Sequence, residues 1–217
     1  MGAGIAGLGF EKLVYGGLTK VFAGIVIAPI GGIIFGLLVT TLIITIFASR
    51  KPGPVNKTFG KLQIISSAWF ALTHGANDGQ KTMGIIVLIL FSAGLIPDLE
   101  MPLWVIFAAA TAMGLGTFFG GYKVIKTLGV KITKLKPYQG FAAETSGGLM
   151  LAIFAVFGIP ASTTHAITGT IMGSGAARRK RAVRWKVSRQ IVFSWLITIP
   201  GAAGLGIGFT YLINLFV

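Results

Sequence analysis

The sequence predicts an all-α fold, a polytopic bundle of membrane helices. Of its 217 residues, 54% are hydrophobic and only 11% are charged, and the mean hydropathy is +0.84. Soluble domains carry about 25% charged residues. The apolar residues also gather in runs long enough to span a bilayer, which needs about 20 residues. An ordinary soluble domain is therefore excluded.

The basic residues mark one side of the membrane. The chain has 19 Lys and Arg against 5 acids, a formal net charge of +14, and most of the cations lie in three acid-free loops at 50–61, 123–136 and 178–189. Basic clusters between apolar segments are typical of cytoplasmic loops that face an anionic leaflet. We therefore predict the lipid bilayer as a partner, no nucleic-acid partner, and cytoplasmic basic loops. The short loops and the lack of a signal or transit pattern favour a prokaryotic inner (cell) membrane.

The elements follow from the apolar runs and their interruptions. In order, we expect a transmembrane helix at 18–47, a broken helix at 62–95, a helix at 103–121, a re-entrant helical hairpin at 141–177 and a helix at 187–217. The hairpin arms, 141–157 and 163–177, are short for a full crossing and both end at basic loops, so they are expected to enter and leave on one side.

The broken helix carries the first candidate site. HGANDGQK at 74–81 interrupts its apolar run, and Gly75 and Gly79 permit the backbone to unwind. The free carbonyls beside Asn77 and Asp78 would suit a sodium ion, or Asp78 a proton. An acid at the bilayer centre costs at least about 2.5 kcal/mol, so Asp78 is expected to have a function. The alternative is an Asn-Asp pair that caps the second half-helix.

The hairpin tip carries the second candidate site. PASTTH at 160–165 places the hydroxyls of Ser162, Thr163 and Thr164 at a helix N-terminus, where unpaired backbone amides bind oxyanions such as phosphate. An ordinary N-cap is the alternative interpretation. Glu144, on the first arm, could pair with the cation or with Lys81, or it could extend to the interface without a partner.

The two histidines of the chain, His74 and His165, each adjoin one of these motifs. Either could relay protons or orient a neighbouring hydroxyl, and a local hydrogen-bonding role is the simpler alternative. Ser162, His165 and Asp78 also supply the residue types of a hydrolase triad. That third hypothesis is weak, because Ser162 and His165 are only three positions apart and no GxSxG motif is present. We expect no enzyme, no catalytic residue and no resident cofactor.

A shift of 171 positions superposes the sequence on itself. MGAGIA at 1–6 aligns with MGSGAA at 172–177, and Val21, Phe22 and Pro29 align with Val192, Phe193 and Pro200. The alignment contains no gap. The loop charges orient the two copies oppositely, which predicts an inverted-topology repeat. Residues 1–61 would then be the tail of a first repeat, and 62–217 a second repeat. Chance similarity among Gly-rich segments is the alternative.

Four segments carry a family resemblance: HGANDGQKTMG, AAETSGG, GIPASTTHAITG and the basic run before AVRW. They resemble the second repeat of PiT-family inorganic phosphate transporters. The resemblance implies symport of phosphate with co-transported sodium or protons. It also implies that Asp78, His74, Glu144 and Ser162 are needed for transport, and that Asn77, Thr163 and Thr164 line the site. We expect Lys81 to bind phosphate as well.

The chain departs from the family pattern because the Gly-Asn-Asp and Ser-rich motifs of a first copy are absent. Half of the implied site is therefore missing, and we expect a homodimer or a partner chain that carries the first repeat. The alternatives are an inactive fragment or split subunit, and a permease for a related oxyanion such as sulfate or for a metal–phosphate complex.

Overall fold

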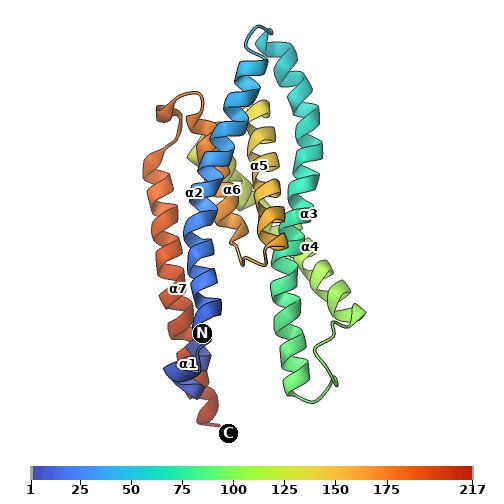
Figure 1. Cartoon of the computed structure of the whole chain (residues 1–217), viewed down its shortest axis with the longest axis vertical. Helices are drawn as coiled ribbons and strands as arrows, with labels where there is room; N and C mark the ends of the chain where they lie inside the picture. The colour runs from blue at the N-terminus through green and yellow to red at the C-terminus, as the bar shows by residue number, and fades with distance from the viewer. Residues whose placement is uncertain (1, 217) are drawn as a thin grey trace. The chain divides into compact units, whose positions relative to one another are not determined.

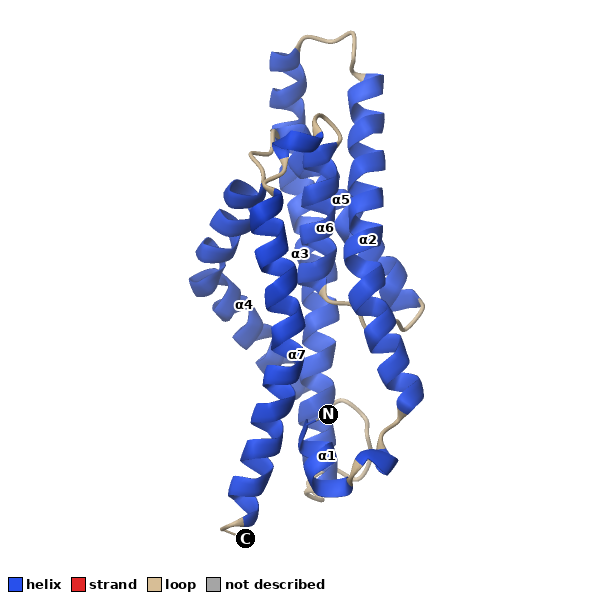
Figure 2. Cartoon of the chain, turned by 90° about the vertical axis from the view of Figure 1, so that its left-hand side faces the viewer, coloured by secondary structure: helices blue, strands red, loops and turns tan. Residues whose placement is uncertain are grey.

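The computed structural model describes residues 2–216, without the side chains at 8, 12, 123–125 and 180. Every regular element within that range is helical, which confirms the all-α class (Figures 1 and 2). In chain order the elements are α1 (Gly2–Leu8), the 3₁₀ turn η1 (Phe10–Lys12), α2 (Tyr15–Ile46), α3 (Pro52–Ser92), α4 (Leu103–Lys126), the π-helical turn η2 (Thr127–Ile132), α5 (Pro137–Val156), α6 (Thr163–Ala176), the 3₁₀ turn η3 (Lys180–Ala182) and α7 (Trp185–Asn214).

The chain forms two compact units. One combines the residues up to Phe22 with those from Arg184 onward, and the other is Ala23–Val183. All the candidate site residues, from His74 to His165, lie in the second unit. The two units do not test the repeat boundary expected between residues 61 and 62, which stays a prediction.

The order of elements recurs along the chain. A helix, a 3₁₀ turn and a long helix with an internal proline occur first as α1, η1 and α2, and again as the end of α6, η3 and α7. The internal prolines are Pro29 and Pro200. The two prolines are 171 positions apart, and the repeat hypothesis stays a prediction.

Among the described residues, three helical segments are long and apolar enough to cross a membrane. They are α2, the segment Leu103–Ile132 and α7, of 32, 30 and 30 residues. At 1.5 Å per residue each is about 45–48 Å long, against a hydrocarbon core of about 30 Å. Large apolar side chains such as Phe118, Phe193 and Phe209 are exposed on these segments, as expected of surfaces that meet lipid.

In the first unit, α1 packs on α7 at small residues. A Cβ on Gly2 would lie 2.0 Å from the carbonyl oxygen of Ala203, and one on Gly206 would lie 3.1 Å from the backbone nitrogen of Ala3. Small residues allow helix backbones to approach this closely.

In the second unit, α2 and α6 also meet backbone to backbone. Four small residues spaced four apart are buried on α2: Gly24, Ala28, Gly32 and Gly36. A Cβ on Gly36 would lie 2.3 Å from the carbonyl oxygen of Thr170, and a Cβ on Gly173 would lie 2.1 Å from that of Ile33. This contact leaves no room for side chains, so it fixes α6 firmly against α2.

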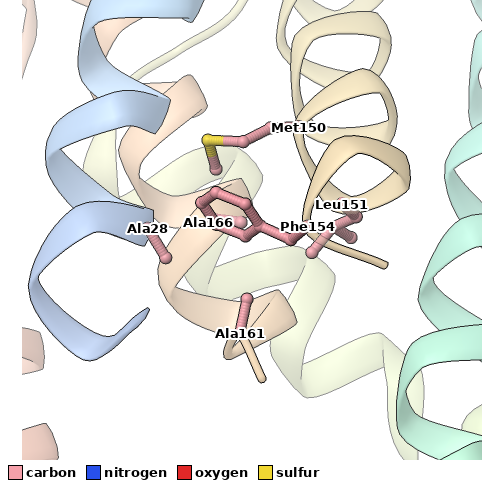
Figure 3. Close-up of a cluster of buried hydrophobic side chains, with 6 residues drawn as sticks. All are labelled: Ala28, Met150, Leu151, Phe154, Ala161 and Ala166. Atoms are coloured by element: carbon pink, nitrogen blue, oxygen red, sulfur yellow. The ribbon is translucent and has the colours of Figure 1, made fainter. Parts of the chain in front are cut away.

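A cluster of buried apolar side chains supports the hairpin tip. Its members are Ala28 of α2, Met150, Leu151 and Phe154 of α5, Ala161 of the connecting loop and Ala166 of α6. Figure 3 shows the larger α5 side chains reaching across to the three alanines. Ala161, in the loop at 157–162, is therefore only 2% exposed.

Helices α5 and α6 form an antiparallel pair, as the predicted hairpin requires. Gln139, near the start of α5, donates to the carbonyl oxygen of Ser174, near the end of α6, at 2.8 Å. The connection contains Gly158, whose φ of 60° is costly for other residues. Helix α6 has 14 residues, so it is about 21 Å long and shorter than the hydrocarbon core. Its re-entry into the membrane remains a prediction.

The predicted break in the helix at 62–95 is wrong. Helix α3 runs unbroken through Gly75 and Gly79 for 41 residues. The polar side chains at its centre find partners on the same helix: Asn77 donates to the backbone carbonyl oxygen of Thr73 at 3.1 Å, and Asp78 pairs with His74 and Lys81. Because these groups find partners within the helix, the backbone has no need to unwind.

Candidate functional site

The site centres on the carboxylate of Asp78, which joins α3 to α6. Its Oδ1 accepts a hydrogen bond from Lys81 Nζ at 2.9 Å. Its Oδ2 lies 3.0 Å from His74 Nε2 and accepts from the Thr163 hydroxyl at 2.8 Å. His74 and Lys81 lie one turn before and after Asp78, so helix geometry alone brings them together. Thr163 is the first residue of α6, and its bond connects the two candidate sites that the sequence predicts.

Lys81 makes a second link to the hairpin tip. Besides Asp78, its Nζ contacts the carbonyl oxygen of Ala161 at 2.8 Å. The ammonium group therefore bridges an acid on α3 and the backbone just before α6. Charge-assisted hydrogen bonds of this length are among the stronger ones in proteins.

The predicted pairing of Glu144 with Lys81 is wrong. The Glu144 carboxylate instead accepts from the Ser66 hydroxyl at 2.6 Å and from the Gln63 amide at 3.3 Å. Ser66 precedes Lys81 by about 22 Å along α3, at 1.5 Å per residue. Because α5 runs antiparallel to α6, Glu144 lies toward the end of the pair that is far from the tip.

Asn77 connects α3 to α5. Its side-chain amide donates to the carbonyl oxygen of Leu151 at 3.4 Å as well as to that of Thr73. The predicted unwound carbonyls beside Asn77 do not exist, since α3 is continuous there. A cation at Asp78 would consequently be held by side-chain oxygens and by carbonyls at the hairpin tip.

The three hydroxyls of the tip have three different surroundings. Ser162 is the N-cap of α6, and its hydroxyl accepts from the backbone N–H of His165 at 3.4 Å. Thr163 is buried against Asp78, whereas Thr164 is exposed and lines a cavity. The capping interpretation of Ser162 is thus confirmed, and it leaves the amides of the first turn at the positive end of the helix dipole.

A cavity of about 890 Å³ lies among α3, α4, η2, α5 and α6. His74, Glu144 and Thr164 share its wall with Gln63 and Thr117, and most of its remaining lining is apolar. Small-molecule sites commonly measure about 300–1,000 Å³ and combine apolar walls with a few polar groups. The cavity thus brings three of the predicted residues to one space, while Asp78, Asn77 and Ser162 lie outside its lining.

Sequence reasoning missed Gln63 and Ser66, the partners of Glu144. They are three positions apart within the apolar stretch LQIISSAW, so they lie on one face of α3. Polar residues at helical spacing inside an apolar stretch were the available signal. Within the described range, no group of three or more His, Cys, Asp or Glu residues could hold a metal ion.

The family assignment comes from comparison with known proteins. Residues 47–206 match the model of the phosphate transporter family. The chain belongs to this family. It is an integral membrane protein, and because the family consists of transporters, the hydrolase hypothesis is excluded.

Curated relatives in bacteria support the assignment. The chain is 47% identical over 204 residues to a "probable low-affinity inorganic phosphate transporter" of Rhizobium meliloti (strain 1021), covering 94% of this chain and 61% of that protein. It is 39% identical over 215 residues to a protein of the same description from Bacillus subtilis (strain 168), covering 99% of this chain and 65% of the relative. The chain thus spans less than two thirds of the length of these relatives.

A solved structure shares the fold. A chain described as "the sodium-dependent phosphate transporter" superposes with a TM-score of 0.84 at 22% identity, covering 100% of this chain and 72% of that one. At this identity the likeness concerns the fold, and it agrees with the helical bundle described above.

Proposed function

We propose that these residues form one repeat of a cation-coupled symporter of inorganic phosphate. The observation that carries the proposal is the linkage of Asp78 to the N-terminus of α6, through Thr163 directly and through Lys81 and Ala161. It puts the Asp78 carboxylate next to a helix end that suits an oxyanion. The names of the curated relatives, all of them described as phosphate transporters or permeases, support phosphate as the substrate.

Phosphate would bind at the hairpin tip. The first-turn amides of α6, the hydroxyls of Ser162, Thr163 and Thr164, and the Lys81 ammonium offer donors to its oxygens. Lys81 and Thr163 are now bonded to Asp78, so phosphate must compete with that carboxylate for both. Asn77, next to Asp78 on α3, would fix the position of α5 at the site through its bond to the carbonyl oxygen of Leu151.

The same competition would couple phosphate to a cation. Two negative charges about 4 Å apart repel by about 4 kcal/mol at an effective dielectric constant near 20. A sodium ion or a proton on Asp78 removes that repulsion and releases Lys81 and Thr163 for phosphate. Each ligand would then strengthen binding of the other by the same factor, as linkage requires. His74 and Glu144, both on the cavity wall, would provide a second position for a cation or a proton.

We further propose that the working transporter contains a first repeat, supplied by a partner chain or replaced by a second copy in a homodimer. The relatives are longer than this chain, and the repeat at an offset of 171 positions supports a second set of motifs. An inactive fragment and a sulfate permease remain the alternatives. The basic loops would face the cytoplasm across a prokaryotic inner membrane.

The test is uptake of radiolabelled phosphate by proteoliposomes, with and without a sodium or a proton gradient. Uptake by this chain alone would support a homodimer, whereas uptake only after co-reconstitution with a first repeat would support the partner hypothesis. If an excess of unlabelled sulfate blocked uptake to the same extent as unlabelled phosphate, that result would contradict phosphate as the preferred substrate.

Two variants test the site in the complete transporter. Asp78→Asn and Ser162→Ala should each abolish uptake while membrane insertion stays intact. Matched controls are Asp98→Asn in an exposed loop and Ser194→Ala on the exposed side of α7, both of which should keep uptake. Normal uptake by either site variant would refute the assignment.

A further inference from the structure

A second, smaller cavity lies where α2 ends and α3 and α5 begin. Its volume is about 200 Å³, and Arg50, Lys136 and Arg178 line it from three different segments. Arg50 belongs to the turn between α2 and α3, Lys136 is the N-cap of α5, and Arg178 follows the end of α6. The fold thus gathers three cations that are far apart in the sequence. We call this cavity the basic hollow.

The basic hollow contains positive charge without compensation. None of the five acids of the chain lines it, and within the described part of the chain the ion pairs all involve Asp78. Two helices, α3 and α5, also start at its rim with Pro52 and Pro137, and a helix N-terminus carries about half a positive charge. An anion would relieve the mutual repulsion of these groups.

The remaining lining is mainly apolar, and it also includes the polar side chains of Asn56 and Tyr138. Ile43 and Ile44 come from the last turn of α2, a helix long enough to cross a membrane, and Phe47 directly follows it. Asn56 donates from its side-chain nitrogen to the carbonyl oxygen of Pro52 at 2.9 Å, while its Oδ1 is buried and has no hydrogen-bond partner among the residues described. A buried acceptor of this kind is costly unless a donor reaches it.

We propose that the basic hollow binds the head group of an anionic phospholipid that bears a hydroxyl, such as phosphatidylglycerol. The lipid phosphate would lie between Arg50, Lys136 and Arg178, and a head-group hydroxyl would donate to Asn56 Oδ1. The acyl chains would follow the apolar end of α2. A volume below the 300 Å³ or so of typical small-molecule sites suits a head group whose tails remain in the bilayer. Basic pockets between membrane helices recognise anionic head groups in this way.

The experiment measures lipid binding to the purified full chain in a neutral detergent. Short-chain phosphatidylglycerol is titrated against the wild type, the double variant R50Q/R178Q and the control K57Q/R181Q, which removes two exposed cations outside the hollow. At about 1 kcal/mol per cation, the hollow variant should bind about 30-fold more weakly, while the control should stay within about twofold of the wild type. Tryptophan fluorescence of all three proteins checks that each is folded.

Three further probes identify the ligand. Phosphatidylcholine and inorganic phosphate should not compete, whereas equal competition by inorganic phosphate would overturn the lipid assignment. Phosphatidylmethanol has the same charge as phosphatidylglycerol but no head-group hydroxyl. It should bind the wild type more weakly than phosphatidylglycerol does, whereas the two lipids should bind Asn56→Ala equally. Equal losses in R50Q/R178Q and K57Q/R181Q would overturn the proposal, because they would show attraction to basic loops in general. None of these outcomes depends on transport activity.

Discussion

The contact between α2 and α6 makes a quantitative prediction for Gly173→Ala. The added Cβ would lie 2.1 Å from the carbonyl oxygen of Ile33 and 2.9 Å from the nitrogen of Leu37, where ordinary contact begins at 3.4 Å. Both neighbours are backbone atoms, so no side chain can rotate away. The helices must therefore separate by about 1 Å, which forfeits a quarter to a half of the dispersion energy at each contact along the seam.

Overpacking of this kind costs about 1–3 kcal/mol, partly offset by about 1 kcal/mol of helix propensity gained with alanine. For a net loss near 1 kcal/mol, we expect the midpoint of thermal unfolding in detergent to fall by about 2–4 °C. The assay is intrinsic fluorescence, since the chain has 4 tryptophans. Gly114→Ala on α4 is the control, because nothing lies within 4 Å of its Cβ, and it should melt no lower than the wild type. A Gly173→Ala variant that melts with the wild type would refute the packing argument.

Three other predictions concern the site and the topology of the complete transporter. Lys81→Gln removes the charge that bridges Asp78 and Ala161, so the KM for phosphate should rise about 10-fold or more, with Lys57→Gln as a control that leaves it unchanged. Thr163→Val keeps the shape of a buried residue but removes the donor that a cation must displace from Asp78, so the apparent cation affinity of uptake should rise about 10-fold while the melting midpoint moves little, and an unaltered cation dependence would contradict this. Because the chain has no cysteine, single cysteines at Asp98 and Thr58 can be labelled with an impermeant maleimide. Only the cysteine at position 98 should react from outside the cell, and labelling of position 58 from that side would reverse the orientation.

The sequence was informative wherever a pattern is local. Apolar runs predicted the long helices, and PASTTH predicted the start of α6 and its Ser162 cap. The same local reasoning failed at Gly75 and Gly79, because glycine permits a break without requiring one. The decision there depends on partners such as His74 and Lys81, which lie on the same helix and satisfy Asp78 only when that helix is intact.

Contacts between distant segments were harder to predict. The Ser66 hydroxyl meets Glu144 across 78 positions of sequence, and neither residue carries information about the other. The small residues of α2, four apart from Gly24 to Gly36, could have indicated a close helix partner. They could not have identified α6 as that partner, because several segments of this chain are rich in glycine.

The continuity of α3 has a mechanical consequence. Gln63 and His74 are 11 positions apart, about three helical turns, so they lie on nearly the same face of one rod, with Asp78 one turn beyond. An intact helix transmits a rotation or a slide along its whole length, whereas two half-helices joined by a hinge would absorb it. Any movement that separates Asp78 from Thr163 will therefore also pull on the Gln63 and Ser66 bonds to Glu144. Because α3 connects the surroundings of both Asp78 and Glu144, a movement of this helix changes the contacts of both acids together.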